Sequence, residues 1–203
     1  RSIAHQFQDD PDAATLFAEA LMDLSPWHYW TADNQPTGHT DDILTTLEQV
    51  LAQHPDHPGA CHLYIHALEA SPFPERALDC ARRLPDLMPG AGHLVHMPAH
   101  LYIRLGRYQE ATERNQQAVR VDRDYLAHRQ LTGSYADGYA AHNLHFLWAT
   151  LLLEGRSAEA LTAARELVAT VPLDNVRKEP SFEVYTAAPL QTLVRFGRWV
   201  DIL

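Results

Sequence analysis

The chain has 203 residues, of which 46% are hydrophobic, so it can bury a substantial core as one domain or as an elongated array. Its formal net charge of −10 argues against nucleic acid and anionic membranes as partners, since both bind basic surfaces. No apolar run approaches the roughly 20 residues that span a bilayer. Cys61 and Cys80 fall among apolar helical positions, so we expect buried free thiols and no thiolate metal site.

Helical patterns follow one another along the chain, without a convincing strand pattern. Residues 12–30 carry apolar side chains at helical spacing, with a proline interruption near their end. A loop is predicted over 31–40, and a second helix over 43–52, with Asp41 or Asp42 as its cap. Helices alternate with short breaks from there on, so we predict an all-α fold.

A local motif recurs three times in the second half of the chain. The tripeptides GRY at 106, GRS at 155 and GRW at 197 begin it, and an alanine follows the first two glycines by five residues, at 111 and 160, while the third copy is cut off. Small side chains let two antiparallel helices pack closely, and glycine makes the turn between them. Ala77 and Ala111 are 34 residues apart, as are Pro55 and Pro89, whereas Gly106 and Gly155 are 49 apart. We therefore expect an insertion of about 15 residues within 122–139, as a loop or an extended helix.

The histidines follow the same spacing. His62 and His66 are four residues apart, as are His96 and His100, and the second pair comes 34 residues after the first. Side chains four apart share one helix face, where two imidazoles can bind one metal ion. Glu69 is the one well-placed carboxylate and the candidate catalytic acid or base. The candidate metal ligands are His28, His57, His62, His66, His93, His96, His100, His142 and His145.

Pro98 complicates one of the helices that would carry these ligands. Proline removes a helix hydrogen bond and disfavours helix just before it. We therefore expect a helix to begin near Met97, with His93 and His96 on the preceding turn.

The ligand type limits the metal and the chemistry. Imidazole suits copper, zinc, iron and nickel, whereas magnesium and calcium need oxygen ligands. More candidates than one ion needs indicate two ions, or one ion with supporting side chains. A dinuclear copper centre that activates oxygen is our first interpretation, which makes the protein a metal-dependent oxidoreductase. Zinc with Glu69 as general base would instead suit hydrolysis.

Two other classes of function stay open. The protein could be a scaffold that binds a peptide, with histidines that contact the partner or sense pH. It could also store or deliver metal without catalysis. A metal enzyme would take a small-molecule or polymer substrate.

The spacing of 34 residues resembles the tetratricopeptide repeat (TPR), a helix–turn–helix unit that stacks into a right-handed superhelix. The resemblance implies one solenoid over 1–203 with about four to five helical pairs. In TPR proteins, the repeat positions that these histidines share line the concave groove. A substrate or a peptide would therefore bind beside them.

The strings HPDHPGACHLYIHALEASPFPERAL, PGAGHLVHMPAHLYIRLGRY and AAHNLHFLWATLLLEGRS are similar to a largely uncharacterised group of bacterial TPR proteins. Members of that group look longer and often carry an export signal. The chain begins at Arg1 without methionine and ends within a third copy of the motif. We therefore expect a segment of a longer, exported protein. The group carries an acidic residue in place of His28.

Overall fold

The computed structural model describes residues 6–7, 9–129 and 135–203, and every regular element among them is helical. One isolated bridge pairs Trp30 with Pro36. The predicted all-α fold is confirmed. Among the described helices, none has the length and apolar character that crossing a membrane requires. The chain divides into two compact units, Arg1–Met88 and Pro89–Leu203, here called unit 1 and unit 2.

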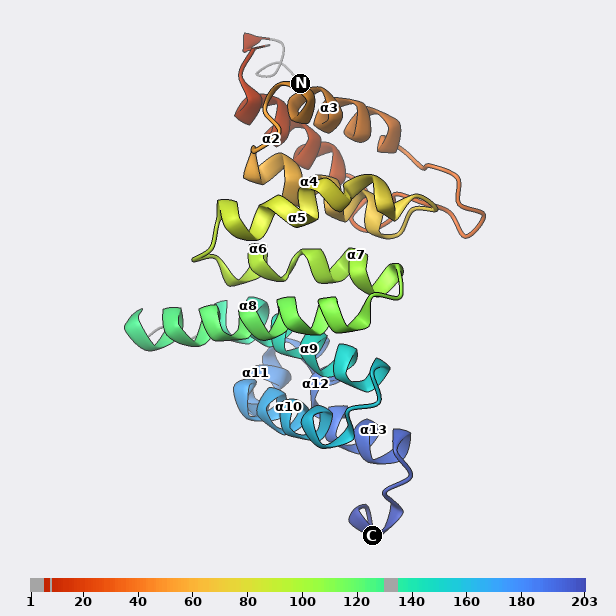
Figure 1. The fold of residues 1–203 in the computed structure, drawn as a ribbon, viewed down its shortest axis with the longest axis vertical. Helices are drawn as coiled ribbons and strands as arrows, with labels where there is room; N and C mark the ends of the chain where they lie inside the picture. The colour runs from red at the N-terminus through yellow and green to blue at the C-terminus, as the bar shows by residue number, and fades with distance from the viewer. Residues whose placement is uncertain (1–5, 8, 130–134) are drawn as a thin grey trace. The chain divides into compact units, whose positions relative to one another are not determined.

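Unit 1 is built from helices that pack against their neighbours in sequence order (Figure 1). They are α2 (Pro11–Met22), α3 (Thr40–Gln53), α4 (Pro58–Glu69), the 3-10 helix η1 (Pro74–Ala77) and α5 (Leu78–Leu87). The connection between α2 and α3 is tied to α4, because the indole N–H of Trp30 donates to the carbonyl oxygen of Ala67 at 2.7 Å. Cys61 and Cys80 are buried free cysteines, as predicted.

The predicted cap of the second helix is wrong. This helix, α3, begins at Thr40 after His39, and Asp41 and Asp42 lie in its first turn. Carboxylates are favourable there because the backbone N–H groups make the helix N-terminus positive. The same preference makes a first-turn aspartate hard to distinguish from a cap in sequence. The helix predicted within 12–30 ends at Met22.

Unit 2 continues the pattern of paired helices (Figure 1). Its main helices are α6 (Gly92–His96), α7 (Pro98–Arg104), α8 (Tyr108–Arg129), α9 (Ala141–Leu153), α10 (Ser157–Thr170) and α13 (Ala188–Arg195). Shorter pieces are the π-helix η2 (Tyr135–Ala140), α11 (Leu173–Lys178), η3 (Pro180–Phe182), α12 (Glu183–Thr186) and η4 (Trp199–Asp201). Its apolar core joins α9 to α10, with Leu147, Trp148 and Leu151 packed near Ala164 and Leu167.

The recurring glycines make the turns that the motif predicts. Gly106, Gly155 and Gly197 have φ of 71°, 76° and 65°, a left-handed conformation that glycine adopts without steric cost. The alanine that follows in the next helix, at 111 or at 160, is fully buried. A larger side chain would push the paired helices apart.

The insertion predicted within 122–139 begins in the C-terminal part of α8 and stays a prediction. Helix α8 runs on to Arg129, well past the start of the predicted segment 122–139. Residues 130–134 of that segment lie outside the described residues. The chain then returns through η2 directly into α9.

The turn glycines allow a test that separates backbone strain from packing. A Cβ added at Gly106 meets no atom within 4 Å, so Gly106→Ala changes only the backbone energy. A non-glycine residue in the left-handed region costs about 1–2 kcal/mol. We expect urea unfolding followed by circular dichroism to show a free energy of unfolding lower by that amount. Gly90→Ala is the control, since Gly90 is equally open and its φ is not left-handed. Equal losses in both variants would contradict this account of the turn.

Candidate metal centre

Histidines of unit 2 lie on both sides of a break between two helices, and the chain keeps its direction across that break. Pro98 has no N–H, so α6 ends at His96 and α7 begins at Pro98. Between them, Met97 keeps a right-handed helical conformation, with φ of −48° and ψ of −37°. His96 and His100 therefore stay on one face, as in an unbroken helix. The predicted break is present, but the placement of His93 and His96 on a turn is wrong, because both lie in α6.

Four imidazole rings meet at this face, three from α6 and α7 and one from α9. Nε2 of His96 lies 2.8 Å from Nε2 of His100 and 3.1 Å from Nε2 of His142. One ring nitrogen each of His93, His96 and His142 lie within 4.8 Å of one another. We call these four residues the histidine cluster. Its ring nitrogens come from three helices, and His96 and His142 are 46 residues apart in the sequence.

Asn115 of α8 determines which nitrogen of His96 carries the proton. Its Oδ1 lies 2.7 Å from Nδ1 of His96, and both residues are fully buried. An amide oxygen only accepts, so Nδ1 donates and Nε2 keeps its lone pair. Supporting groups of this kind hold histidine ligands in metal sites.

Burial keeps the His96 ring neutral. Desolvation is the largest cause that lowers its pKa well below 6.5, followed by the neighbouring rings of His100 and His142. The bond to Asn115 acts in the opposite direction and offsets part of the shift. Because a neutral imidazole is the form that binds metal, protons compete weakly for this ring at neutral pH.

An aromatic side chain closes one side of the cluster. The ring centroid of Phe146 lies 4.6 Å from that of His96, 4.5 Å from His100 and 4.7 Å from His142. His100 is buried, whereas His93 and His142 are partly exposed. The cluster is thus apolar at its base and reachable from solvent at its rim.

The spacing of the nitrogens suits a transition-metal ion. Imidazoles bound at about 2.0–2.1 Å around a tetrahedral ion hold their nitrogens about 3.3–3.4 Å apart. The two Nε2 distances from His96 are a few tenths of an ångström shorter, a difference that small ring rotations remove. All donors in the cluster are imidazole nitrogens, which suit copper, zinc, iron or nickel and not magnesium or calcium.

His145, a predicted ligand on the same helix, faces elsewhere. Its ring stacks on Trp148, with centroids 5.3 Å apart, and contacts Tyr185 at 5.2 Å. Burial among these side chains lowers the pKa of His145. Its contacts with Trp148 and with Tyr185 of α12 hold it away from the cluster.

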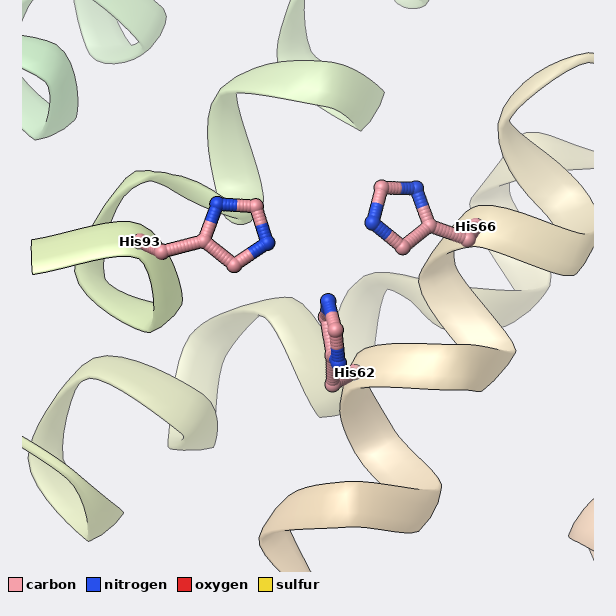
Figure 2. A group of neighbouring side chains, drawn as sticks. All are labelled: His62, His66 and His93. Atoms are coloured by element: carbon pink, nitrogen blue, oxygen red, sulfur yellow. The ribbon is translucent and has the colours of Figure 1, made fainter. Parts of the chain in front are cut away.

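The predicted residues of unit 1 include one helical pair. Figure 2 shows His62 and His66 extending from successive turns of α4, and their ring centroids are 4.9 Å apart. Nδ1 of His66 lies 2.8 Å from Oε1 of Glu69. An imidazole held by a carboxylate is a common arrangement for a metal ligand. That these residues share one centre with the histidines of unit 2 stays a prediction.

Two predicted ligands have other structural positions. His57 is the N-cap of α4: its Nδ1 accepts from the N–H of Ala60, and its Nε2 lies 3.0 Å from Oδ1 of Asp12. Both ring nitrogens are thus engaged within unit 1. His28 was placed on a helix by repeat phase, but it lies beyond the end of α2 and is exposed. The irregular turn after α2 breaks the phase on which that placement depended.

Asn115 and Phe146 were missed by the sequence analysis. Asn115 is a polar residue in the buried face of α8 between Ala111 and Ala118, and this interruption was the available signal. Phe146 follows His142 by four residues and so shares its face.

The chain is similar to solved structures of TPR proteins. Nearly identical TPR-like repeats described as a kinesin light chain, from Podospora anserina, align with a TM-score of 0.67 at 18% identity, over 94% of this chain and 88% of that one. A thermophilic TPR protein from Thermus thermophilus aligns with a TM-score of 0.60 at 18% identity, over 92% and 85%. The MamA protein aligns with a TM-score of 0.55 at 12% identity, over 92% and 95%.

No family model and no curated protein sequence matches the chain. At these identities the structural likeness shows the fold alone. The chain therefore has a TPR-like helical-repeat fold, and the predicted fold class is confirmed.

Proposed function

We propose that the protein is a metal-binding TPR protein whose unit 2 holds a transition-metal ion in the histidine cluster. His93, His96 and His142 are the proposed ligands, with His100 beside them as a further ligand or a supporting side chain. The observation that carries this proposal is the convergence of ring nitrogens from α6, α7 and α9 around the buried Nε2 of His96.

The main structural alternative is a network of histidine hydrogen bonds without an ion. With its proton on Nδ1, His96 offers one lone pair at Nε2, and His100 and His142 both face it. One lone pair accepts one well-formed hydrogen bond, whereas the ring nitrogens of both His100 and His142 lie within 3.1 Å of it. An ion removes this conflict, because it accepts a lone pair from each ring.

We propose an oxidative metal enzyme as the first function, with copper as the first candidate and zinc or iron as the second. Bound copper would supply one-electron chemistry towards oxygen or a substrate. The chain's own contribution is to hold the imidazoles in place and to exclude water at His96, while the partly exposed His93 and His142 leave an approach for a small molecule. The number of ions and a role for Glu69 as acid or base in zinc-dependent hydrolysis stay predictions.

A second candidate function is binding of a protein partner, and a specific feature of unit 1 favours it. A cleft of about 590 Å³ lies between α2 and α4. Leu16 and Leu63 give it an apolar wall, and Asp12 and Glu19 give it two carboxylates. TPR-like folds present such clefts between successive helices, and a peptide with apolar and basic side chains would complement this one.

The metal proposal predicts a selective loss of binding. Untagged protein purified without a metal column should bind Cu²⁺ or Zn²⁺ in calorimetric titration. Mutation of a residue that only supports a metal ligand typically lowers the metal affinity about 10–100-fold. Removal of a ligand itself should therefore lower the affinity by about 100-fold or more. We expect this loss in His142→Ala, which removes a partly exposed ring, and in His96→Gln, which keeps the buried site polar and filled.

The matched control for these variants is His145→Ala. It removes a histidine from the same helix but outside the cluster, so the affinity should stay at the wild-type value. His62→Ala reports separately on unit 1. Equal affinities in His142→Ala and His145→Ala would exclude the cluster as the site. A wild-type protein that binds neither metal would favour the peptide-binding alternative.

The buried neutral His96 also predicts how stability depends on pH. In the unfolded chain its pKa returns to about 6.5, whereas in the folded protein it is lower. Below pH 6.5 the unfolded state therefore binds more protons, and the free energy of unfolding falls by up to about 1.4 kcal/mol per pH unit until the folded ring titrates. We expect the urea midpoint of the metal-free protein to fall between pH 7 and 5.5, and to fall less in His96→Gln. An identical pH dependence in both proteins would contradict the burial of a neutral ring.

A further inference from the structure

One buried carboxylate contacts the sequence neighbours of two proposed ligands, His93 and His142. It belongs to Asp122 of α8, which is 2% exposed. The side-chain N–H of Asn143 donates to its Oδ2 at 2.7 Å, and the hydroxyl of Tyr135 donates to its Oδ1 at 2.8 Å. Gly92 lies against the same group, since a Cβ added there would be 1.9 Å from Oδ1 of Asp122.

These three contacts tie four elements together. Gly92 begins α6, Tyr135 begins η2 and Asn143 lies in the first turn of α9, so the carboxylate on α8 contacts each of the other three. His93 follows Gly92 and His142 precedes Asn143, and consecutive Cα atoms are fixed about 3.8 Å apart. A contact that holds residues 92 and 143 therefore limits the backbone positions of both ligands.

An aromatic path links the same network to His93. Tyr135 packs against Tyr139, with ring centroids 5.8 Å apart, and Tyr139 meets the ring of His93 at 4.9 Å. Both tyrosines belong to η2, the π-helix that leads into α9. π-helices are rare, and the one-residue offset they introduce often occurs at functional sites.

We propose that Asp122 is the positioning residue of the histidine cluster, and that its carboxylate fixes the backbone segments carrying His93 and His142 at the separation that metal binding needs. This inference rests on the proposed function. It also explains why position 92 is glycine, because any side chain there would displace the carboxylate. The insertion in the repeat then has a role, since it brings Tyr135 back to Asp122.

A structural role alone would not favour this residue type. A buried carboxylate loses hydration, and this desolvation is the main cause that raises the pKa of Asp122, with the bonds from Asn143 and Tyr135 opposing it. Well-packed apolar residues of similar volume often serve stability as well or better at such positions. An acceptor that joins two donors is needed only if those donors must be held at defined places.

The test compares three variants by calorimetric titration with Zn²⁺. Asp122→Ala removes both acceptors, and the affinity should fall by about 10–100-fold. Asp122→Asn should keep the wild-type affinity, because its oxygen can accept from Asn143 while its N–H donates to the hydroxyl oxygen of Tyr135. The control is Leu167→Ala in the core of α9 and α10, which lowers the melting temperature without touching the cluster. If Asp122→Ala does not fold, Tyr135→Phe with Tyr125→Phe as its control tests the same bond.

A second measurement needs no metal. In nitrogen NMR spectra of the histidine rings, Asp122→Ala should change the chemical shifts of His93 and His142 but not those of His145. In the Leu167→Ala variant, the histidine rings should keep their wild-type chemical shifts. Unchanged His93 and His142 rings in Asp122→Ala would overturn the inference, as would equal shifts in Leu167→Ala. If the rings shift but the wild-type protein binds no Zn²⁺, the positioning role stands and the proposed function fails.

Discussion

The buried ring of His96 meets three polar side chains in a space that excludes water, and the chemistry of unit 2 depends on how that contact is resolved. Asn115 holds the proton on Nδ1, so the lone pair on Nε2 faces His100 and His142 at 2.8 and 3.1 Å. A transition-metal ion would bind a lone pair from each ring, and the neutral state that burial imposes on His96 is the state that binds metal.

The helical repeat brings these rings together through simple geometry. Histidines four residues apart share a face of α6 and α7 because Met97 keeps its helical conformation at the proline break. α8 packs against both α6 and α7, and α9 contacts α6, so Asn115 and His142 reach the ring of His96 from two different helices. The unusually long α8 also carries Asp122, so one helix supports the cluster at two points seven residues apart, about two turns.

Much of this architecture could be predicted from the sequence, because it depends on local preferences. Glycine at 106, 155 and 197 predicts left-handed turns, and alanines in phase predict close helix pairs. The proline at 98 correctly indicates a break before His100.

What could not be predicted depends on helices remote in sequence or on small rotations. His145 shares the repeat phase of His96, yet it faces Trp148 and Tyr185, since its side chain is set by contacts with α12 that no local pattern encodes. Asn115 and Asp122 act on histidines 19 or more residues away and carry no motif of their own. His28 was misplaced because the turn after α2 ends the repeat phase early.

Binding of a transition-metal ion through the imidazoles of the histidine cluster can be tested by X-ray absorption at the metal edge of untagged protein loaded with one equivalent of Cu²⁺. We expect three or more nitrogen neighbours at about 2.0 Å with the multiple-scattering signature of imidazole, and loss of that signature in His142→Ala. A spectrum with oxygen neighbours alone, or one that His142→Ala leaves unchanged, would contradict it.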